Sequence, residues 1–483
     1  MASTQTTATD LAGRPLVITF WSFGCEASIA AVERVQDLVA GWPGQVAAVA
    51  VHTPRFPYED DERRLTQAVA RHRIDLPVVH DPDYLTWNRY NPVGWPATAV
   101  VDRNGRVVGM AHGIDGMDTV VDVVAGEIAR PVGRRDRDRP AARSGGASGS
   151  GTGGRRATAL ASVPDRVTST ALDRLERDRD HTSLWFPSAL AVTRSGMTAV
   201  ADTGNDRLLV GRLDDDRRTF RPGVEITDVD RPTAVAFGGD DLLYAIERGT
   251  GSVIQIDLIA GTVDIVADGE LEAPTDLLVD VDGSLVVADA GRDQLIRIVG
   301  TGGSDVLIGP IAGRGATGCD DGPADRAELA QPVAMARTSK GIAFCDAASS
   351  NVRILTDGGR VLTATGNEFF DWGLVDGPAA AARFQRPSGL AATADELVVA
   401  DTGNDRLRVL SRRKVRTLGL TGLDQPTGLA AVDGGLLLVA DTGNHRLVLV
   451  DPADSRAWTV DVYPAAMTSV WEDEPAEGRR RPG

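Results

Sequence analysis

Cys25 stands at a position where a cysteine can act as a nucleophile. The stretch FWSFGCEAS (residues 20–28) ends an apolar run typical of a buried strand and leads into apolar residues at helical spacing. A thiol at the start of a helix lies near free backbone N–H groups, which stabilise the reactive thiolate. Three residues later, Ser28 occupies the place where a second cysteine would complete a CxxC motif. The CxxS spacing therefore predicts monothiol redox chemistry, because a serine hydroxyl cannot resolve a mixed disulfide.

A second motif, GWPATAVVDRNG (residues 94–105), places Pro96 directly before a predicted strand. Together the two motifs resemble the thioredoxin fold, in which a cis-proline lies beside the reactive sulfur. The resemblance implies that Cys25 is the nucleophile and that Pro96, matching the cis-proline, shapes the substrate groove. It also implies that Trp21 and Trp95 border this groove.

Further motifs resemble one particular family, which fuses a thioredoxin-like domain to NHL repeats. They are VHTPRFPYED (residues 51–60), LPVVHDPDYLTW (76–87) and GWPATAVVDRNGRVVG (94–109). Members of that family commonly carry two cysteines in CxxC, whereas this chain has Ser28 at the second place. Gly24 also stands where some members have an additional cysteine.

The chemistry of Cys25 has three interpretations. The first is a redox or thiol-sensing module that forms a mixed disulfide with a protein or a low-molecular-weight thiol, or is oxidised to sulfenic acid. The second is a degenerate thioredoxin fold that serves as a protein-interaction scaffold. The third is peroxiredoxin-like reduction of peroxide, since Ser22-x-x-Cys25 resembles the motif of those enzymes; Glu26, however, replaces the proline that follows their cysteine.

The first 130 residues alternate strand and helix patterns, which predicts a mixed sheet with helices on its faces. The turn Asn104–Gly105 indicates a hairpin between the last two strands. The expected order is β-α-β-α-β-β-α, with these elements: Leu16–Trp21, Ala27–Val39, Gln45–Val51, Asp60–His72, Thr98–Asp102, Arg106–Met110 and Asp118–Ile128.

A Gly/Ser-rich and arginine-rich stretch separates two predicted domains. Residues 131–160 contain seven arginines and two aspartates among many glycines and serines, a composition typical of a flexible linker. The sequence thus predicts a thioredoxin-like domain at 1–130, a linker at 131–160, a connector of uncertain structure at 161–182, a repeat domain at 183–465 and a tail at 466–483.

Residues 183–465 contain six similar units of short β runs, and six units predict a six-bladed β-propeller. The sixth blade could be complete without a borrowed strand, or residues 161–182 could close the ring. Each unit begins at a proline: Pro187, Pro232, Pro274, Pro332, Pro387 and Pro426. Each second β run ends in an acid: Asp202, Glu247, Asp289, Asp346, Asp401 and Asp441.

Three turns in the propeller are nearly identical and resemble the NHL signature: ADTGNDRL twice and ADTGNHRL once. Aspartate, glycine and asparagine suit a tight hairpin turn, so these residues are mainly structural. The turns also carry Arg207, Arg406 and Arg446, which usually pair with aspartate but could contact an anionic surface.

Two insertions repeat one another and each contains an Asp-Gly-Pro tripeptide. Asp321 lies eleven residues before Pro332, and Asp376 lies eleven residues before Pro387. The blade topology predicts that these loops lie on the same face as the TGN turns. Because loops on a rigid scaffold commonly carry function, we predict that this face, with Asp321 and Asp376, binds a protein partner or connects to the thioredoxin-like domain.

Composition narrows the remaining classes of function. A net charge of −17 argues against binding to nucleic acid, and no apolar stretch approaches the length of a membrane span, so a cytoplasmic protein is expected. The six histidines are scattered, which predicts no metal site and no cofactor; His52 and His80 end strands and could line the groove. Asp276 is the one clear acid on the inner strands, which disfavours a metal-dependent hydrolase. Cys319 and Cys345 are expected to be free thiols.

Overall fold

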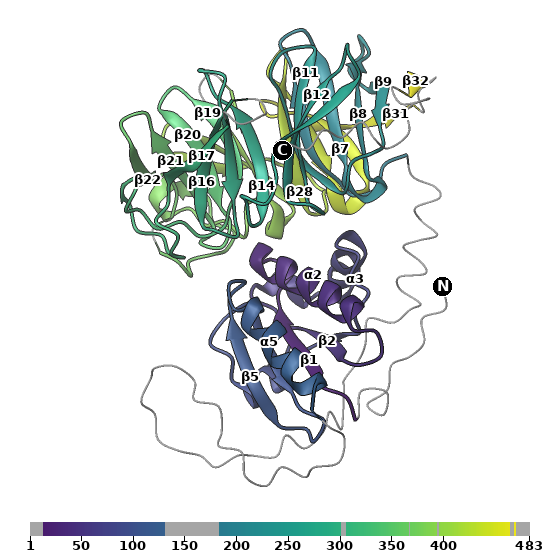
Figure 1. The fold of residues 1–483 in the computed structure, drawn as a ribbon. Helices are drawn as coiled ribbons and strands as arrows, with labels where there is room; N and C mark the ends of the chain where they lie inside the picture. The colour runs from purple at the N-terminus through teal and green to yellow at the C-terminus, as the bar shows by residue number, and fades with distance from the viewer. Residues whose placement is uncertain are drawn as a thin grey trace. The chain divides into compact units, whose positions relative to one another are not determined.

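The computed structural model describes residues 13–130, 183–300, 306–366, 368–393, 396–463 and 468–469. The chain divides into two compact units, Met1–Arg177 and Asp178–Gly483, and each is described by itself (Figure 1). The predicted linker, the connector and almost all of the predicted tail lie outside the described residues.

The first unit is an α/β domain with a five-stranded sheet in the order β3-β2-β1-β4-β5. β1, β2 and β3 are parallel, whereas β4 is antiparallel to both β1 and β5. The elements are β1 (Leu16–Trp21), α2 (Glu26–Gly41), β2 (Ala47–His52), the short helix η1 (Pro57–Asp60), α3 (Glu62–Arg71), β3 (Val78–His80), α4 (Leu85–Tyr90), β4 (Ala97–Val101), β5 (Val107–His112) and α5 (Met117–Ile128).

Burial explains the sequence pattern of this sheet. All six residues of β1 and all six of β2 are buried, as expected for central strands covered on both faces. Alternate residues of β1 therefore pack on opposite sides: Val17 joins the apolar residues of α2 and α5, and Ile18 packs with Ala99 on the other face.

The expected element order lacked the short helix η1 before α3 and was also incomplete between α3 and β4. The structure adds the three-residue strand β3 and the six-residue helix α4 there. Both are too short for a periodic pattern to appear in the sequence. The mixed sheet with helices, the predicted thioredoxin-like fold class, is confirmed.

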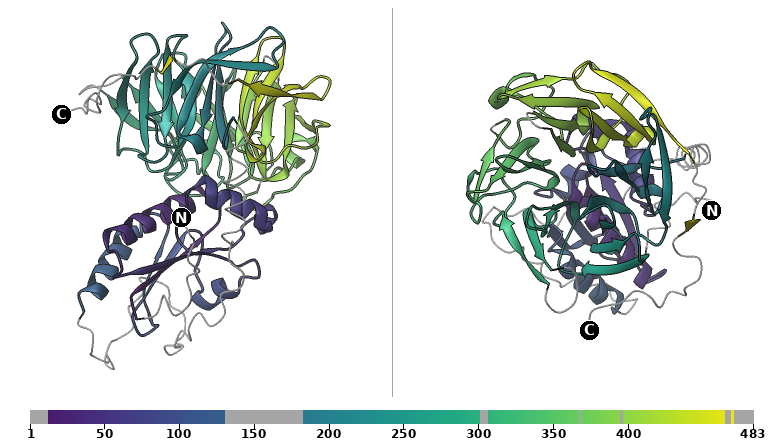
Figure 2. Two further views of the ribbon diagram at one scale, coloured as in Figure 1. Left: turned by 90° about the vertical axis from the view of Figure 1, so that its right-hand side faces the viewer. Right: turned by 90° about the horizontal axis from the view of Figure 1, so that it is seen from above.

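The second unit is a six-bladed β-propeller, as predicted (Figure 2, right). Each blade has at least four antiparallel strands. The first strands of successive blades contact one another around a central channel. The blades are β6 (Pro187–Val192), β7 (Met197–Asp202), β8 (Arg207–Leu213) and β9 (Thr219–Ile226); β10 (Pro232–Phe237), β11 (Leu242–Glu247), β12 (Ser252–Asp257) and β13 (Thr262–Ala267); β14 (Pro274–Val279), β15 (Leu285–Asp289), β16 (Gln294–Val299) and β17 (Leu307–Ala312); β19 (Pro332–Thr338), β20 (Gly341–Asp346), β21 (Asn351–Thr356) and β22 (Arg360–Thr363); β24 (Gly389–Ala392), β25 (Glu396–Asp401), β26 (Arg406–Ser411) and β27 (Lys414–Thr417); β28 (Pro426–Val432), β29 (Leu436–Asp441), β30 (Arg446–Asp451) and β31 (Arg456–Val462).

The predicted prolines and acids mark the blades. Five inner strands begin at the predicted proline, and the fifth blade begins two residues after Pro387, at Gly389. Each of the six acids ends the second strand of its blade. The backbone N–H two residues before each proline donates to the acid of the same blade; for example, Gln385 donates to Asp401 at 2.7 Å. The acid therefore joins the entry of the inner strand to the end of the second strand.

Among the described residues, the strands of blades 1 and 6 join into one sheet, which bears on the closure that the sequence left open. Blades 1 and 6 each contain four strands from their own repeat, and the outer strands β31 and β9 pair in parallel across the seam. The short strand β32 (Thr468–Ser469) also pairs with β9. Among the described residues, blade 6 needs no strand from residues 161–182.

Blades 4 and 5 each gain a fifth strand from the predicted insertions. β18 (Gly322–Pro323) pairs with β22, and β23 (Gly377–Pro378) pairs with β27. The expectation that the Asp-Gly-Pro loops lie on the face of the TGN turns was therefore wrong for the tripeptides themselves. They extend to the outer edge of each blade because their backbone groups complete the hydrogen bonds of an otherwise open strand.

Candidate functional site

Cys25 is the N-cap of α2, as its sequence position suggested. Its backbone is extended, with φ −126° and ψ 110°, and its carbonyl accepts the N–H of Ile29 at 3.1 Å. The N–H of Cys25 donates to the carbonyl of Ser22 at 3.1 Å, which closes a tight loop between β1 and α2. The thiol is buried and directly precedes the first turn of a 16-residue helix. The structure thus places it at the N-terminus of α2, as the sequence predicted.

Ser28 lies in the first turn of α2, three residues after Cys25. Its side chain is fully buried, and its Oγ has no hydrogen-bond partner among the described residues. A cysteine side chain is close in size to serine and weaker as a hydrogen-bonding group. The site therefore has no polar contact that requires serine rather than cysteine.

The Trp95–Pro96 peptide bond is cis, as the resemblance implied. It precedes β4, whose Ala97 pairs with Phe20 of β1. Because Trp21 follows Phe20, the Cys25 loop and Pro96 leave the sheet at the same edge.

Aromatic rings accompany Pro96 at this edge. Trp95 is partly exposed and packs against Trp87 with tilted rings at a ring-centre distance of 4.3 Å, while its indole N–H donates to the carbonyl of Thr53 at 3.0 Å. Trp21, the other predicted groove residue, is fully buried and packs on His52. Trp95 is therefore suited to border a groove, whereas Trp21 supports the loop from beneath.

Sequence reasoning missed a buried glutamate beneath the loop. Glu59 is 0% exposed and accepts hydrogen bonds from the Ser22 hydroxyl at 2.7 Å and from the Arg55 N–H at 2.9 Å. A side chain at position 24 would place its Cβ 2.0 Å from the Glu59 carboxylate, so Gly24 is required here. A charged residue in FPYEDDE gives no signal of burial, because charged side chains are rarely buried.

His52 and His80 do meet, at the carboxyl ends of β2 and β3. Their ring centres are 5.4 Å apart, and His52 stacks on Phe23 at 5.0 Å. Burial, with a smaller contribution from His80, lowers the pKa of His52 well below its usual range. His52 Nε2 is 3.9 Å from Glu59 and the imidazole is neutral at neutral pH, so the pair forms no strong ion pair. His52 is fully buried and His80 is partly buried.

In the propeller, Asp321 binds a guanidinium of its own blade. Arg353 on β21 is 0% exposed and donates to Asp321 at 2.9 Å and to Asp346 at 3.1 Å. Asp321 also accepts the Thr363 N–H at 2.8 Å. The insertion is thus fastened to blade 4 by a buried cation.

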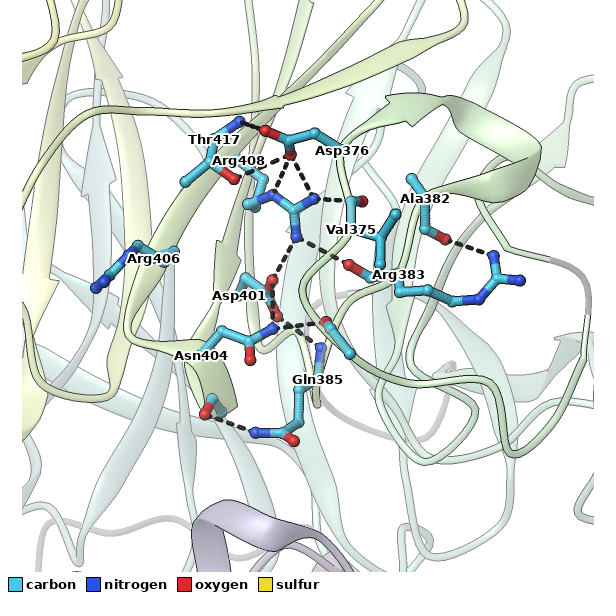
Figure 3. A network of polar contacts seen from close by, with 12 residues as sticks. Val375, Asp376, Ala382, Arg383, Gln385, Asp401, Asn404, Arg406, Arg408 and Thr417 are labelled. Carbon is cyan, nitrogen blue, oxygen red and sulfur yellow. Dashed lines mark hydrogen bonds and ion pairs between the residues drawn. The ribbon is translucent and has the colours of Figure 1, made fainter.

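The second insertion repeats this arrangement in blade 5 (Figure 3). Arg408 on β26 is 0% exposed and donates to Asp376 at 2.7 Å and to Asp401 at 2.8 Å. Asp376 accepts the Thr417 N–H at 2.9 Å. Although partial burial opposes it, these hydrogen bonds and the cation hold the pKa of Asp376 below its usual value. Both predicted binding aspartates therefore have a structural partner, and their part in binding stays a prediction.

The three predicted arginines differ in their contacts. Arg207 donates to Asp202 at 2.7 Å and to Glu225 at 2.9 Å, and Arg446 donates to Asp441 at 2.7 Å. Arg406 makes no ion pair among the described residues and donates to the carbonyl of Asp405 at 2.9 Å. It points away from the Arg408 network (Figure 3).

The inner strands surround a channel of about 660 Å³. Asp276 lies in its wall and accepts the Met335 N–H of the next blade at 2.6 Å; burial raises its pKa to about 7. Cys319 and Cys345 are free thiols, and burial raises the pKa of both. Among the described residues no group of His, Cys, Asp and Glu is arranged to hold a metal ion. None of the described helices has the length and hydropathy needed to span a membrane.

Comparison with known proteins supports both the thioredoxin-like domain and the NHL-repeat propeller. Residues 423–448 match the NHL repeat family. The chain is 25% identical over 92% of its length to the chloroplastic protein SUPPRESSOR OF QUENCHING 1 of Arabidopsis thaliana, of which it spans 44%. It is 24% identical over 94% of its length to NHL repeat-containing protein 2 of Bos taurus, of which it spans 68%. Less than half of the first relative is therefore represented here.

Two matches cover single parts of the chain. The thiol-disulfide oxidoreductase YkuV of Bacillus subtilis is 29% identical over 22% of this chain and 70% of its own length. A catalytically inactive virginiamycin B lyase from Staphylococcus aureus, determined with quinupristin, aligns with a TM-score of 0.41 and 12% identity over 59% of this chain and 89% of that chain. The predicted resemblance to thioredoxin-like/NHL-repeat fusion proteins is confirmed by the sequence relatives.

Proposed function

We propose that this chain is a monothiol thioredoxin-like redox or thiol-sensing module, carried by an NHL-type propeller that binds a protein partner. The observation that carries the proposal is Cys25 as the N-cap of α2, at the sheet edge shared with the cis Trp95–Pro96 bond. The same module order in relatives named for NHL repeats, and the match to a thiol-disulfide oxidoreductase, support it.

The proposed step is thiol–disulfide exchange. The Cys25 thiolate attacks one sulfur of a substrate disulfide, a Cys25–substrate disulfide forms, and the other substrate sulfur leaves as a thiolate. Ser28 cannot attack this mixed disulfide, so an external low-molecular-weight thiol must cleave it and regenerate Cys25. The mixed disulfide is therefore a long-lived state, which suits capture of a partner or sensing of the thiol pool.

Trapping of mixed disulfides tests this proposal. The full chain is incubated with oxidised glutathione or cell extract, quenched with acid and analysed by non-reducing electrophoresis and mass spectrometry. We expect an adduct on Cys25 that dithiothreitol removes, and no adduct in Cys25→Ser. Cys345→Ser is the matched control, because Cys345 is also a buried thiol. Equal adduct formation in Cys25→Ser, or none in the wild type, would contradict the proposal.

Ser28→Cys tests the consequence of the missing second thiol. Because Ser28 Oγ has no hydrogen-bond partner among the described residues, cysteine should fit without loss of a polar contact. We expect Ser28→Cys to shorten the lifetime of the Cys25 mixed disulfide and to yield an internal disulfide. Ser28→Ala should leave the wild-type lifetime unchanged. A Ser28→Cys lifetime equal to that of Ser28→Ala would show that position 28 does not control release.

A protein-interaction scaffold is the second candidate, favoured by an apolar segment in the blade 5 insertion. Phe370 is 76% exposed, and Leu374 and Val375 are 49% and 47% exposed, beside the rigid Arg408 network. Apolar side chains exposed on a fixed loop are typical of protein-binding surfaces. Partners captured equally by wild type and Cys25→Ser, but lost in Phe370→Ser, would favour a scaffold. We expect either function to operate in a reducing compartment such as the cytoplasm.

A further inference from the structure

Neighbouring blades are joined by a repeated hydrogen bond at the turns between their second and third strands. The residue before the blade proline donates its backbone N–H to the side chain of the last turn residue in the preceding blade. In three seams the acceptor is an aspartate and in one it is a serine. The four pairs are Arg231 to Asp206 at 3.1 Å, Gln331 to Asp293 at 2.7 Å, Arg386 to Ser350 at 3.2 Å and Gln425 to Asp405 at 2.9 Å.

The same bond closes the ring, but there the acceptor is an imidazole. The N–H of Phe186 in blade 1 donates to Nδ1 of His445 in blade 6 at 3.1 Å. His445 has φ 55°, the left-handed conformation that Asp206 and Asp405 adopt in the corresponding turns. His445 therefore replaces an acidic acceptor at the one seam where the last blade meets the first.

The imidazole is also packed between aromatic rings of blade 1. His445 stacks on Trp185 at a ring-centre distance of 4.0 Å and meets Phe186 edge-on at 4.4 Å. Trp185 in turn lies against Gly204 of its own turn, where a Cβ would come within 2.3 Å of the indole. This packing fixes the ring so that Nδ1 faces the Phe186 N–H.

Only a neutral His445 can make this bond. Nδ1 accepts a hydrogen, so the proton of the neutral ring must be on Nε2. A second proton would place an N–H on Nδ1, opposite the Phe186 N–H, and remove the only lone pair directed at blade 1. Stacking of an imidazolium on Trp185 would offset part of this loss but would not restore an acceptor.

Charged groups near the seam are already paired. In blade 6, Asp441 accepts from Arg446 at 2.7 Å; in blade 1, Arg207 donates to both Asp202 and Glu225. Among the described residues, Arg446, Asp461 and Tyr463 line a cavity of about 440 Å³ together with His445. Asp424 also lies at the seam, and its N–H donates to Asp441.

We propose that His445 is a pH-sensitive latch of the propeller ring, which loosens the seam between blades 6 and 1 when it is protonated. Other contacts keep the ring assembled, including Thr427 to the Ser188 carbonyl at 2.8 Å and Thr442 to the Pro187 carbonyl at 2.7 Å. Protonation therefore increases local opening at the turns without separating the blades.

Amide exchange of Phe186 tests the latch in the full chain. The protein, which has 10 phenylalanines, is labelled with ¹⁵N-phenylalanine, and exchange is followed at about pH 7.5 and about pH 5.5, where histidine changes charge. Rates are divided by the intrinsic rate at each pH. We expect Phe186 to lose roughly two- to tenfold protection at the lower pH, the range of one net hydrogen bond.

Two variants separate the latch from general acid destabilisation. His445→Asn keeps an oxygen acceptor and tolerates the left-handed backbone, so we expect the pH difference at Phe186 to disappear. Asp405→His is the reciprocal change and should create a pH difference at the Gln425 amide, followed by ¹⁵N-glutamine labelling. Equal Phe186 protection at both pH values in the wild type, or the same loss of protection in His445→Asn, would overturn the proposal.

Discussion

Blades 1 and 6 differ from blades 4 and 5 in the arginine that neutralises the acid of the second strand. In blades 1 and 6 it stands five residues after the acid, as in Asp202–Arg207, and the Arg207 side chain is 23% exposed. In blades 4 and 5 it stands seven residues after the acid, as in Asp401–Arg408, and its side chain is 0% exposed. Two residues along a strand leave the side chain on the same face, so the cation moves along the strand, away from the turn, without changing sides.

The shifted position of the arginine in blades 4 and 5 goes together with the Asp-Gly-Pro insertions of these two blades. A guanidinium two residues further along the strand meets the insertion. Besides Asp376, Arg408 reaches the insertion carbonyls of Val375 and Arg383 at 2.8 and 2.9 Å. Blade 5 has both arginines, and Asp401 pairs with Arg408 rather than Arg406. The acid that ends the second strand therefore takes part in two kinds of ion pair. One is the partly exposed pair at the turn, as in Asp202–Arg207. The other, which we call the clamp, is the buried arginine that joins this acid to the aspartate of the insertion, as Arg408 joins Asp401 to Asp376.

Removal of the buried cation has the largest expected effect. Arg408→Ala leaves Asp401 buried without its cation and removes the cation from Asp376, so we expect a loss of about 3–5 kcal/mol in the free energy of unfolding. Urea unfolding followed by far-ultraviolet circular dichroism measures it. Arg353→Ala should behave alike in blade 4, because Arg353 makes the equivalent contacts. A loss below about 1 kcal/mol in both variants would remove the distinction between the two kinds of ion pair.

The positions of the blades, but not the destination of the insertions, could be predicted from the sequence. Prolines such as Pro232 and turns such as residues 203–205 report local backbone geometry, so the sequence shows them directly. Asp376 instead accepts hydrogen bonds from Thr417, 41 residues away in the sequence, and from Arg408, 32 residues away. Such pairing depends on strand order in space, which no local pattern contains.

The candidate thiol site likewise contains residues that the sequence predicts and residues that it does not. Cys25, Ser28 and Pro96 were evident because each belongs to a short motif with a defined chemical role. Glu59 was not, because its burial beneath the loop results from the packing of η1 against β1 and β2. The same holds for His445, whose sequence position suggested only a variant turn residue.

The partly exposed pair should matter less than the clamp. Arg207→Ala leaves Asp202, which still accepts from Trp185 and Asn205, so we expect a loss of about 1–2 kcal/mol. Thermal unfolding of Arg207→Ala and Arg408→Ala, measured side by side, compares the two losses of stability. A loss equal to that of Arg408→Ala would mean that the covering insertion adds nothing to the pair.

Asp376, the exposed carboxylate of the clamp, should make a pH-dependent contribution to the free energy of unfolding. The pKa of Asp376 is lowered in the fold, so its stabilisation is present above the ordinary aspartate value of 3.8 and is lost as the pH falls through the folded value. We expect Asp376→Asn to cost about 1 kcal/mol at neutral pH, since the side chain is 49% exposed. Urea unfolding at a series of pH values should show the difference from wild type narrowing below about pH 4. A constant difference across that range would assign the loss to the hydrogen bonds alone.

The smallest expected effect on stability belongs to Arg406, the arginine that blade 5 does not use for its acid. Its guanidinium donates to a backbone carbonyl and makes no ion pair among the described residues, so Arg406→Ala should change the free energy of unfolding by less than about 0.5 kcal/mol. An unused guanidinium beside a rigid clamp remains available to an anionic partner. If the propeller binds such a partner, Arg406→Ala should weaken capture in a pull-down at unchanged stability. A destabilisation equal to that of Arg207→Ala would instead show that both arginines of blade 5 support the fold.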